Sequence, residues 1–341
     1  MGTISKLNEY FFDNKSIICY YYYKYFHICS YQMMIDGFHH KEVTMKPELV
    51  LDSRSFLAET PIWDSRKKII YWTDLFEGLV HEFDPVAGLD KVHTLGGMIG
   101  SAIPSDSGKL LCAMDDGLYL YDPENGSKTF LVAVEPGNPA NRQNDARCDA
   151  AGRVFVSTVS KAYGTADYRE DMLGSFYMVD TDLAVTRITA GINQYNGIAW
   201  PLDNQAMYVV DTHHMELLRF PYDLSVGVTG SAAVAIKFPS DYGAPDGLLI
   251  DAEDKAWIFH WNGVITRWDL ASGTLLAVIP MPVPYVTCGG FGGEKLDELY
   301  VTTSHYAMTP EQLSAEPLCH AGSMFRLLPG VVGRMDNFYK G

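Results

Sequence analysis

The chain has 341 residues, of which 47% are hydrophobic and 20% charged, a composition typical of a globular protein with a large buried core. Its formal net charge is −16 at pH 7, and such a chain repels phosphate backbones, so we expect no nucleic-acid partner. Acidity suits a protein that binds cations, but it also serves solubility in general.

The first 45 residues differ from the rest of the chain. They contain the tyrosine run Tyr20 to Tyr23, and their four lysines are balanced by four acidic residues, so the net negative charge belongs to the remaining chain. The stretch 16–34 is about long enough to span a bilayer, but it contains Lys24 and lacks both an aliphatic run and signal-peptide order. We interpret 1–45 as an extension created by a start codon upstream of Met45. A membrane anchor or targeting segment is the alternative.

From residue 46 onward, one pattern recurs six times: a polar turn, a short strand rich in aromatic and β-branched residues, a second turn, and another alternating strand. The first strands of the units are centred on residues 40 to 53 positions apart, namely Tyr71, Leu111, Phe155, Tyr208, Trp257 and Tyr300. The second strands are GLVHEFDP, GLYLYDP, GSFYMVD, LLRFPYD, VITRWDL and SMFRLLP. Alternation with period two predicts half-buried β-strands, and no helical period intervenes.

A repeat of this length is typical of β-propeller blades. We therefore predict an all-β fold, a six-bladed β-propeller over 46–341. Two β-sandwiches would not explain a unit that recurs six times. The WD-repeat type of propeller is not favoured, because its Gly-His and Trp-Asp signatures are absent apart from Trp268-Asp269.

The cysteines of this region are widely spaced and form no CxxC pair. We expect Cys112, Cys148, Cys288 and Cys319 to be reduced thiols rather than zinc ligands or a disulfide framework.

Polar residues interrupt the blade pattern in four segments, at Glu59, Asn144, Asn196 and Asp246. Each comes just before the repeated strand of its own unit, and equivalent positions in different blades converge on the ring axis. Taken alone, Asn196 and Asp246 would be turn residues before glycine, and Glu59 a solvated loop residue. Together, two carboxylates and one or two amide oxygens suit Ca²⁺, Mg²⁺ or Mn²⁺. We thus predict a central metal site, with Asp246 at the end of a loop.

Five motifs resemble the gluconolactonase, regucalcin (senescence marker protein) and luciferin-regenerating enzyme family. They span about Leu49 to Leu328 and read AETPIWD with IIYWTD, NRQNDARCDAAGRVFVST, YNGIAWPLDNQAMYVVDT, APDGLLIDAEDKAWIFHW and PMPVPYVTCGGFGGEKLDELYVTTS. Ala146 stands where the family usually has glycine, and Tyr195 where it often has a small residue. The extension before Met45 has no counterpart in the family.

The resemblance implies one catalytic divalent metal, Ca²⁺, Mg²⁺, Mn²⁺ or Zn²⁺, held by Glu59, Asn196 and Asp246. It implies that Arg142 and Asn144 contact the substrate, and that Asp246 is also the catalytic acid/base. The expected function is hydrolysis of a small sugar lactone by a cytoplasmic protein, without membrane attachment, that is monomeric or weakly homo-oligomeric.

Two alternatives use the same scaffold. One is a phosphotriester or aryl ester hydrolase, for which the loop 160–174 with Tyr163 and Tyr168 would supply an aromatic pocket. The other is a calcium-binding propeller without catalysis. His260 and Trp261 either line the same pocket or pack within a blade.

Overall fold

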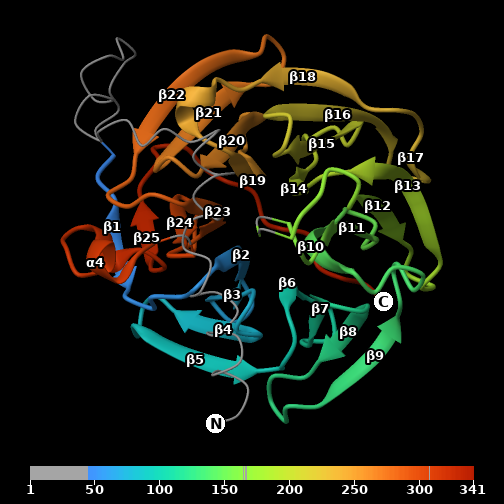
Figure 1. Ribbon diagram of the computed structural model, residues 1–341, viewed down its shortest axis with the longest axis horizontal. Helices are drawn as coiled ribbons and strands as arrows, with labels where there is room; N and C mark the ends of the chain where they lie inside the picture. The colour runs from blue at the N-terminus through green and yellow to red at the C-terminus, as the bar shows by residue number, and fades with distance from the viewer. Residues whose placement is uncertain (1–44, 164, 166, 307) are drawn as a thin grey trace.

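The computed structural model describes residues 45–341 except 164, 166 and 307 (Figure 1). Apart from Met45, the expected extension 1–45 lies outside the described residues. Six antiparallel sheets surround a common axis and form a six-bladed β-propeller, which confirms the predicted all-β fold (Figure 1).

Each blade is a meander of neighbouring strands that runs from the axis outward. The inner strands are β2 (Ala58–Asp64), β6 (Ile99–Pro104), β10 (Asn141–Cys148), β14 (Tyr195–Ala199), β19 (Pro245–Ile250) and β23 (Val286–Gly292). The second strands are β3 (Ile69–Asp74), β7 (Leu110–Met114), β11 (Val154–Ser160), β15 (Ala206–Asp211), β20 (Lys255–His260) and β24 (Glu298–Thr303). The third strands are β4 (Leu79–Asp84), β8 (Leu118–Tyr121), β12 (Gly174–Val179), β16 (Glu216–Asp223), β21 (Val264–Asp269) and β25 (Met324–Leu327). The outer strands are β5 (Leu89–Thr94), β9 (Lys128–Val132), β13 (Val185–Ile192), β17 (Gly227–Val228) with β18 (Ala233–Lys237), β22 (Thr274–Pro280) and β1 (Glu48–Leu51).

The ring is closed by its earliest described strand. β1 is the outer strand of the last blade, where it pairs antiparallel with β25 and places Leu49 opposite Phe325. This pairing joins the two ends of the repeat, so the first and last blades are held together by backbone hydrogen bonds as well as by packing.

The hydrophobic core is divided among the blade interfaces. Six clusters of buried side chains lie between the blades; one contains Trp72 and Tyr300, from the first and last blades. The inner and second strands of the first blade are buried along their whole length, whereas its outer strand is largely exposed. The expectation of half-buried strands is therefore wrong for the inner layers, because neighbouring blades cover both faces of each sheet.

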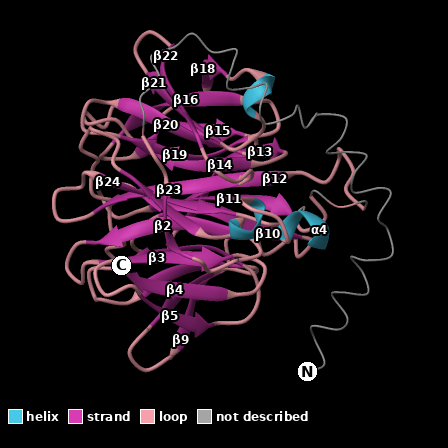
Figure 2. Cartoon of the chain, turned by 90° about the vertical axis from the view of Figure 1, so that its left-hand side faces the viewer, coloured by secondary structure: helices cyan, strands magenta, loops and turns pink. Residues whose placement is uncertain are grey.

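The inner strands run from one face of the ring to the other, and we call the face at which they begin the entry face. The short helices η1 (Ser240–Tyr242), α4 (Pro310–Leu313) and η2 (Leu318–His320) lie at one face of the ring (Figure 2). At the opposite face, the C-terminal segment crosses the ring: Ala252 donates its N–H to the Val332 carbonyl, and Tyr339 donates to that of Pro104. No helix among the described residues is long and apolar enough to cross a membrane.

Candidate functional site

All five residues assigned a role from the sequence line one cavity at the entry face. Glu59 lies on β2, Arg142 and Asn144 on β10, Asn196 on β14, and Asp246 on β19. Each is at most 8% exposed, and the cavity that they share has a volume of about 220 Å³. The convergence of inner strands on the axis thus brings together residues that are far apart in the sequence.

The site residues lie inside the inner strands, where each strand shifts its register against the second strand. Asn144, Asn196 and Asp246 occupy the same position of this β-bulge, and Glu59 lies one position earlier, before Thr60 with φ of 49°. The expectation that Asp246 stands at a loop end is therefore wrong. A bulge re-aims side chains locally, which explains how polar groups reach the axis from a buried strand.

The glycines after two site residues permit this close approach of strands and do not form turns. A Cβ added at Gly197 would lie 2.2 Å from the backbone nitrogen of Leu248, and one at Gly247 would lie 2.8 Å from the Cα of Cys288. Both distances are shorter than van der Waals contact. Asn-Gly and Asp-Gly here therefore indicate packing of adjacent inner strands, not the turns that they suggest in isolation.

A chain of hydrogen bonds fixes the amide side chains. Nη1 of Arg142 donates to Oδ1 of Asn144 over 2.8 Å, and Nδ2 of Asn144 donates to Oδ1 of Asn196. Nδ2 of Asn196 donates to Oγ1 of Thr212 over 2.7 Å, and that hydroxyl donates to the carbonyl of Pro245 over 2.8 Å. The three blades that carry β10, β14 and β19 are thereby linked across the cavity floor.

The two predicted carboxylate ligands each accept one hydrogen bond. Trp261 donates from Nε1 to Oδ2 of Asp246 over 2.7 Å, and the Cys288 thiol donates to Oε2 of Glu59 over 3.0 Å. Burial raises the pKa of Glu59 well above its usual range, and the charges of Asp246 and Asp145 raise it further. Burial likewise raises the pKa of Asp246, again with a contribution from Asp145.

Asp145 is a site residue that sequence reasoning missed. Ligand atoms of Glu59, Asp145 and Cys288 all lie within 4.8 Å of one another, and all three residues are buried. Burial raises the pKa of Asp145 to about 6, against the opposing charges of Arg147 and Arg142. Three buried carboxylates therefore face the axis, where two had been expected. The adjacent pair Asn144-Asp145 could have indicated this third carboxylate. A β-bulge can direct two consecutive side chains toward the same region, whereas a regular strand directs them to opposite faces.

Arg142 is the cation at the cavity wall. Burial lowers its pKa to about 10, the nearby charge of Glu59 opposes that shift, and the side chain stays protonated at neutral pH. Its guanidinium carbon lies 5.7 Å from the centre of the Phe76 ring. Arg142 and the buried Arg147 provide two positive charges near the three carboxylates, so ionisation of all three would leave an excess of negative charge in a low-dielectric site.

Aromatic side chains form the outer wall of the cavity. Phe76 stacks with Tyr306 at 5.6 Å between ring centres, and Tyr163 meets Tyr168 edge-on at 4.9 Å. Both tyrosines of the loop 160–174 line the cavity, as does Trp261. The expectation that this loop supplies aromatic surface is confirmed.

His260 and Trp261 have different surroundings. His260 is fully buried and its Nε2 lies 2.8 Å from Oγ1 of Thr266, and burial lowers its pKa to about 3. It packs within the blade, whereas Trp261 lines the cavity. Cys112, Cys148, Cys288 and Cys319 are not joined in disulfides, so the expectation that they form no disulfide framework is confirmed.

The donor atoms at the axis fit a hard divalent cation. Glu59, Asn196 and Asp246 offer carboxylate and amide oxygens, and the surplus of buried negative charge would be offset by such an ion. Fold and site together define a six-bladed propeller in which buried carboxyl and amide groups lie in an aromatic-walled cavity at the entry face.

Residues 57–305 match the SMP-30/Gluconolactonase/LRE-like region, and the chain belongs to this family. It is 30% identical to Pentonolactonase XacC of Haloferax volcanii over 84% of this chain and 96% of that protein. It is 27% identical to regucalcin of Xenopus laevis over 83% of this chain and 94% of that protein. Among solved structures, a calcium-binding regucalcin from Agrobacterium tumefaciens superimposes with a TM-score of 0.80 at 30% identity, covering 87% of this chain and 98% of that one.

Proposed function

We propose that this protein is a metal-dependent hydrolase that opens a small sugar lactone. The observation that carries the proposal is the convergence of Glu59, Asn196 and Asp246 with Arg142 and Asn144 in one cavity of about 220 Å³. Membership of a family that contains lactonases supports the same reaction class.

Glu59, Asn196 and Asp246 would hold the ion, Ca²⁺, Mg²⁺, Mn²⁺ or Zn²⁺. When bound, it supplies positive charge that polarises the lactone carbonyl and lowers the pKa of water in the site. Asp145 lies behind Glu59 and adds negative charge that favours a divalent over a monovalent cation.

Asp246 is the proposed general base. Trp261 donates to its Oδ2 over 2.7 Å and so fixes the carboxylate that would take the proton from the attacking water. The water oxygen then forms a bond to the carbonyl carbon, and the ring carbon–oxygen bond breaks. Asp246 returns its proton to the departing alkoxide, so the product is the open hydroxy acid and the enzyme is unchanged.

Arg142 and Asn144 are the proposed substrate contacts. The hydrogen bond between them fixes the guanidinium at the cavity wall. Its remaining N–H groups would donate charge-assisted hydrogen bonds to the ring hydroxyls or the ester oxygen of the substrate. Asn144 also braces Asn196, so it couples substrate contact to the ligand shell.

A second reaction, hydrolysis of an aryl ester or phosphotriester, is favoured by one observation. Phe76, Tyr163, Tyr168, Trp261 and Tyr306 line the cavity and would pack against an aromatic leaving group. The third possibility, calcium binding without catalysis, rests on the name of the Agrobacterium relative. Cytoplasmic location and a monomeric or weakly associated state stay predictions.

One assay separates these functions. Purified protein is stripped with a chelator, reloaded with each cation in turn, and tested on matched panels of aldonolactones, aryl esters and phosphotriesters. The proposal expects lactones to be preferred, activity to vanish on chelation, and readdition to restore it. Preference for aryl substrates would favour the second reaction, and metal binding without turnover would favour the third.

A further inference from the structure

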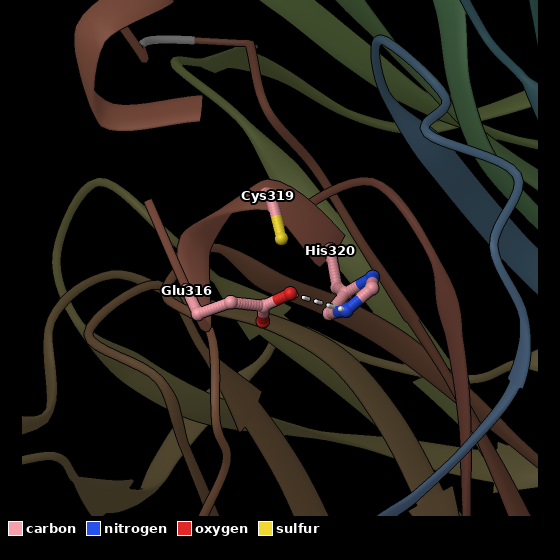
Figure 3. Close-up of side chains that lie close together, drawn as sticks. All are labelled: Glu316, Cys319 and His320. Carbon is pink, nitrogen blue, oxygen red and sulfur yellow. Dashed lines mark ion pairs between the residues drawn. The ribbon is translucent and has the colours of Figure 1, made fainter. Parts of the chain in front are cut away.

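A second group of metal-ligating side chains lies away from the axis, in the β24–β25 loop. Glu316, Cys319 and His320 point toward one another, and their ligand atoms all lie within 4.8 Å (Figure 3). Nε2 of His320 is 3.3 Å from Oε1 of Glu316. Cys319 and His320 lie in η2 and are half-buried, whereas Glu316 precedes η2 and its side chain is 72% exposed.

Asp52 orients the histidine of this group from a distant part of the sequence. Its Oδ1 lies 3.1 Å from Nδ1 of His320 and also accepts a hydrogen bond from Ser323 over 3.0 Å. Arg54 donates to both oxygens of Asp52, which keeps that carboxylate ionised and in place. A carboxylate on Nδ1 holds the proton there and turns the lone pair of Nε2 toward the other two side chains, an arrangement common behind metal-bound histidines.

The ligand types select the metal. A thiolate, an imidazole and a carboxylate suit Zn²⁺, whose bond lengths of about 2.0–2.3 Å in a tetrahedron separate neighbouring nitrogen and oxygen ligands by about 3.4 Å. The observed separation of 3.3 Å between His320 and Glu316 matches that spacing. We propose that Glu316, Cys319 and His320 form a Zn²⁺ site, with Asp52 as the positioning carboxylate and water as the fourth ligand.

The site would stabilise a wall of the entry-face cavity. The same loop carries Tyr306, which lines the cavity and stacks with Phe76. Zinc would link η2 through His320 to Asp52, which directly follows the closing strand β1, and so would brace the loop against the segment that joins β1 to the first blade. Its role is structural, because none of its ligands lines that cavity.

Cobalt substitution tests the site directly, because Co²⁺ takes tetrahedral zinc sites and a cobalt–thiolate bond has a charge-transfer absorption. Full-length protein is kept reduced, stripped of metal and titrated with Co²⁺ and then Zn²⁺. We expect the absorption to appear as Co²⁺ is added and to be displaced by Zn²⁺. Cys319→Ser should abolish it, and Asp52→Asn should weaken Zn²⁺ binding about 10- to 100-fold.

Cys288→Ser is the matched control, because Cys288 is the thiol beside Glu59 at the axis. The absorption should survive that change. Its loss in Cys288→Ser, its retention in Cys319→Ser, or its absence from the wild type would each overturn the assignment. Circular dichroism and thermal melting of each variant show that the fold is intact, and the absorption reports on this site whether or not the protein hydrolyses lactones.

Discussion

Replacing Glu59 by glutamine should weaken metal binding and stabilise the metal-free protein at the same time. The change keeps the size of the side chain and an oxygen that can accept the hydrogen bond from the Cys288 thiol, but it removes one of three buried groups that can carry negative charge. Two unit charges 4.8 Å apart repel by about 3 kcal/mol at an effective dielectric constant of 20, and proton uptake limits the cost actually incurred.

The loss of binding can be estimated from the contact removed. A hydrogen bond or ligand contact to a charged group contributes about 1.5–3 kcal/mol, which corresponds to a rise in Kd of about 10- to 150-fold. The melting temperature of the metal-free variant should rise, because burial and the charges of Asp246 and Asp145 raise the pKa of Glu59 and so disfavour its ionised form.

The assay is calorimetric titration of Ca²⁺ and Mn²⁺ into chelator-stripped protein, with thermal unfolding in excess chelator alongside. Glu170→Gln is the matched control, since Glu170 lines the same cavity but is exposed at its rim. That control should bind metal nearly as the wild type does. Equal affinity of wild type and Glu59→Gln would remove Glu59 from the metal site, and a lower melting temperature of the metal-free variant would refute the repulsion argument.

Further changes test other parts of the site. Asp246→Asn should abolish lactone hydrolysis and leave circular dichroism unchanged; normal turnover would remove Asp246 as the base. Trp261→Phe removes the hydrogen bond to Asp246 and should lower kcat about fivefold, which corresponds to about 1 kcal/mol of activation free energy. KM for small lactones should stay nearly constant, and an unchanged kcat would argue against that contact. Burial raises the folded-state pKa of Asp145 to about 6, so the protonated group stabilises the metal-free protein near pH 4, and this stabilisation of at most about 3 kcal/mol is lost as pH rises through 6. Asp145→Asn should therefore make the melting temperature of the metal-free protein depend less on pH over this range. An unchanged pH dependence would refute the shift. Deleting residues 1–44 should leave activity intact, because β1 begins at Glu48, and loss of folded, active protein would contradict this.

The ring of blades was predictable because each blade is a local structure. In a meander, strands that are neighbours in the sheet are also neighbours in the sequence. The strand-and-turn pattern of each blade is therefore visible in one continuous stretch of sequence, as around Tyr71 and Trp257. The closing strand was not predictable in this way. Glu48–Leu51 pairs with a strand near the far end of the chain, and nothing local in ELVL distinguishes an outer strand of the last blade from one of the first.

The candidate ligands were predictable for a related reason, and their neighbours were not. Asn144, Asn196 and Asp246 stand at one repeated position, so symmetry alone brings them to the axis. Asp145 and Cys288 occupy the second position of the same β-bulges, where strict alternation would direct the side chain away from the first. The pairing of Asp52 with His320 joins residues 268 positions apart, and only the closed ring places them together.

Closure of the ring would also complete the proposed metal site. Glu59 belongs to the first blade, and the bonds that join it to the last include the one from the Thr287 hydroxyl to the carbonyl of Ala58. An open ring would separate Glu59 from Asp246 and bind the cation poorly. A ligand that binds only the closed form stabilises that form by mass action. The stabilisation is about 2.7 kcal/mol at a ligand concentration 100 times Kd. The repulsion among Glu59, Asp145 and Asp246 works in the opposite direction, since it weakens the closed ring when the cation is absent. If these carboxylates hold the proposed cation, they would couple the stability of the propeller to the supply of that metal.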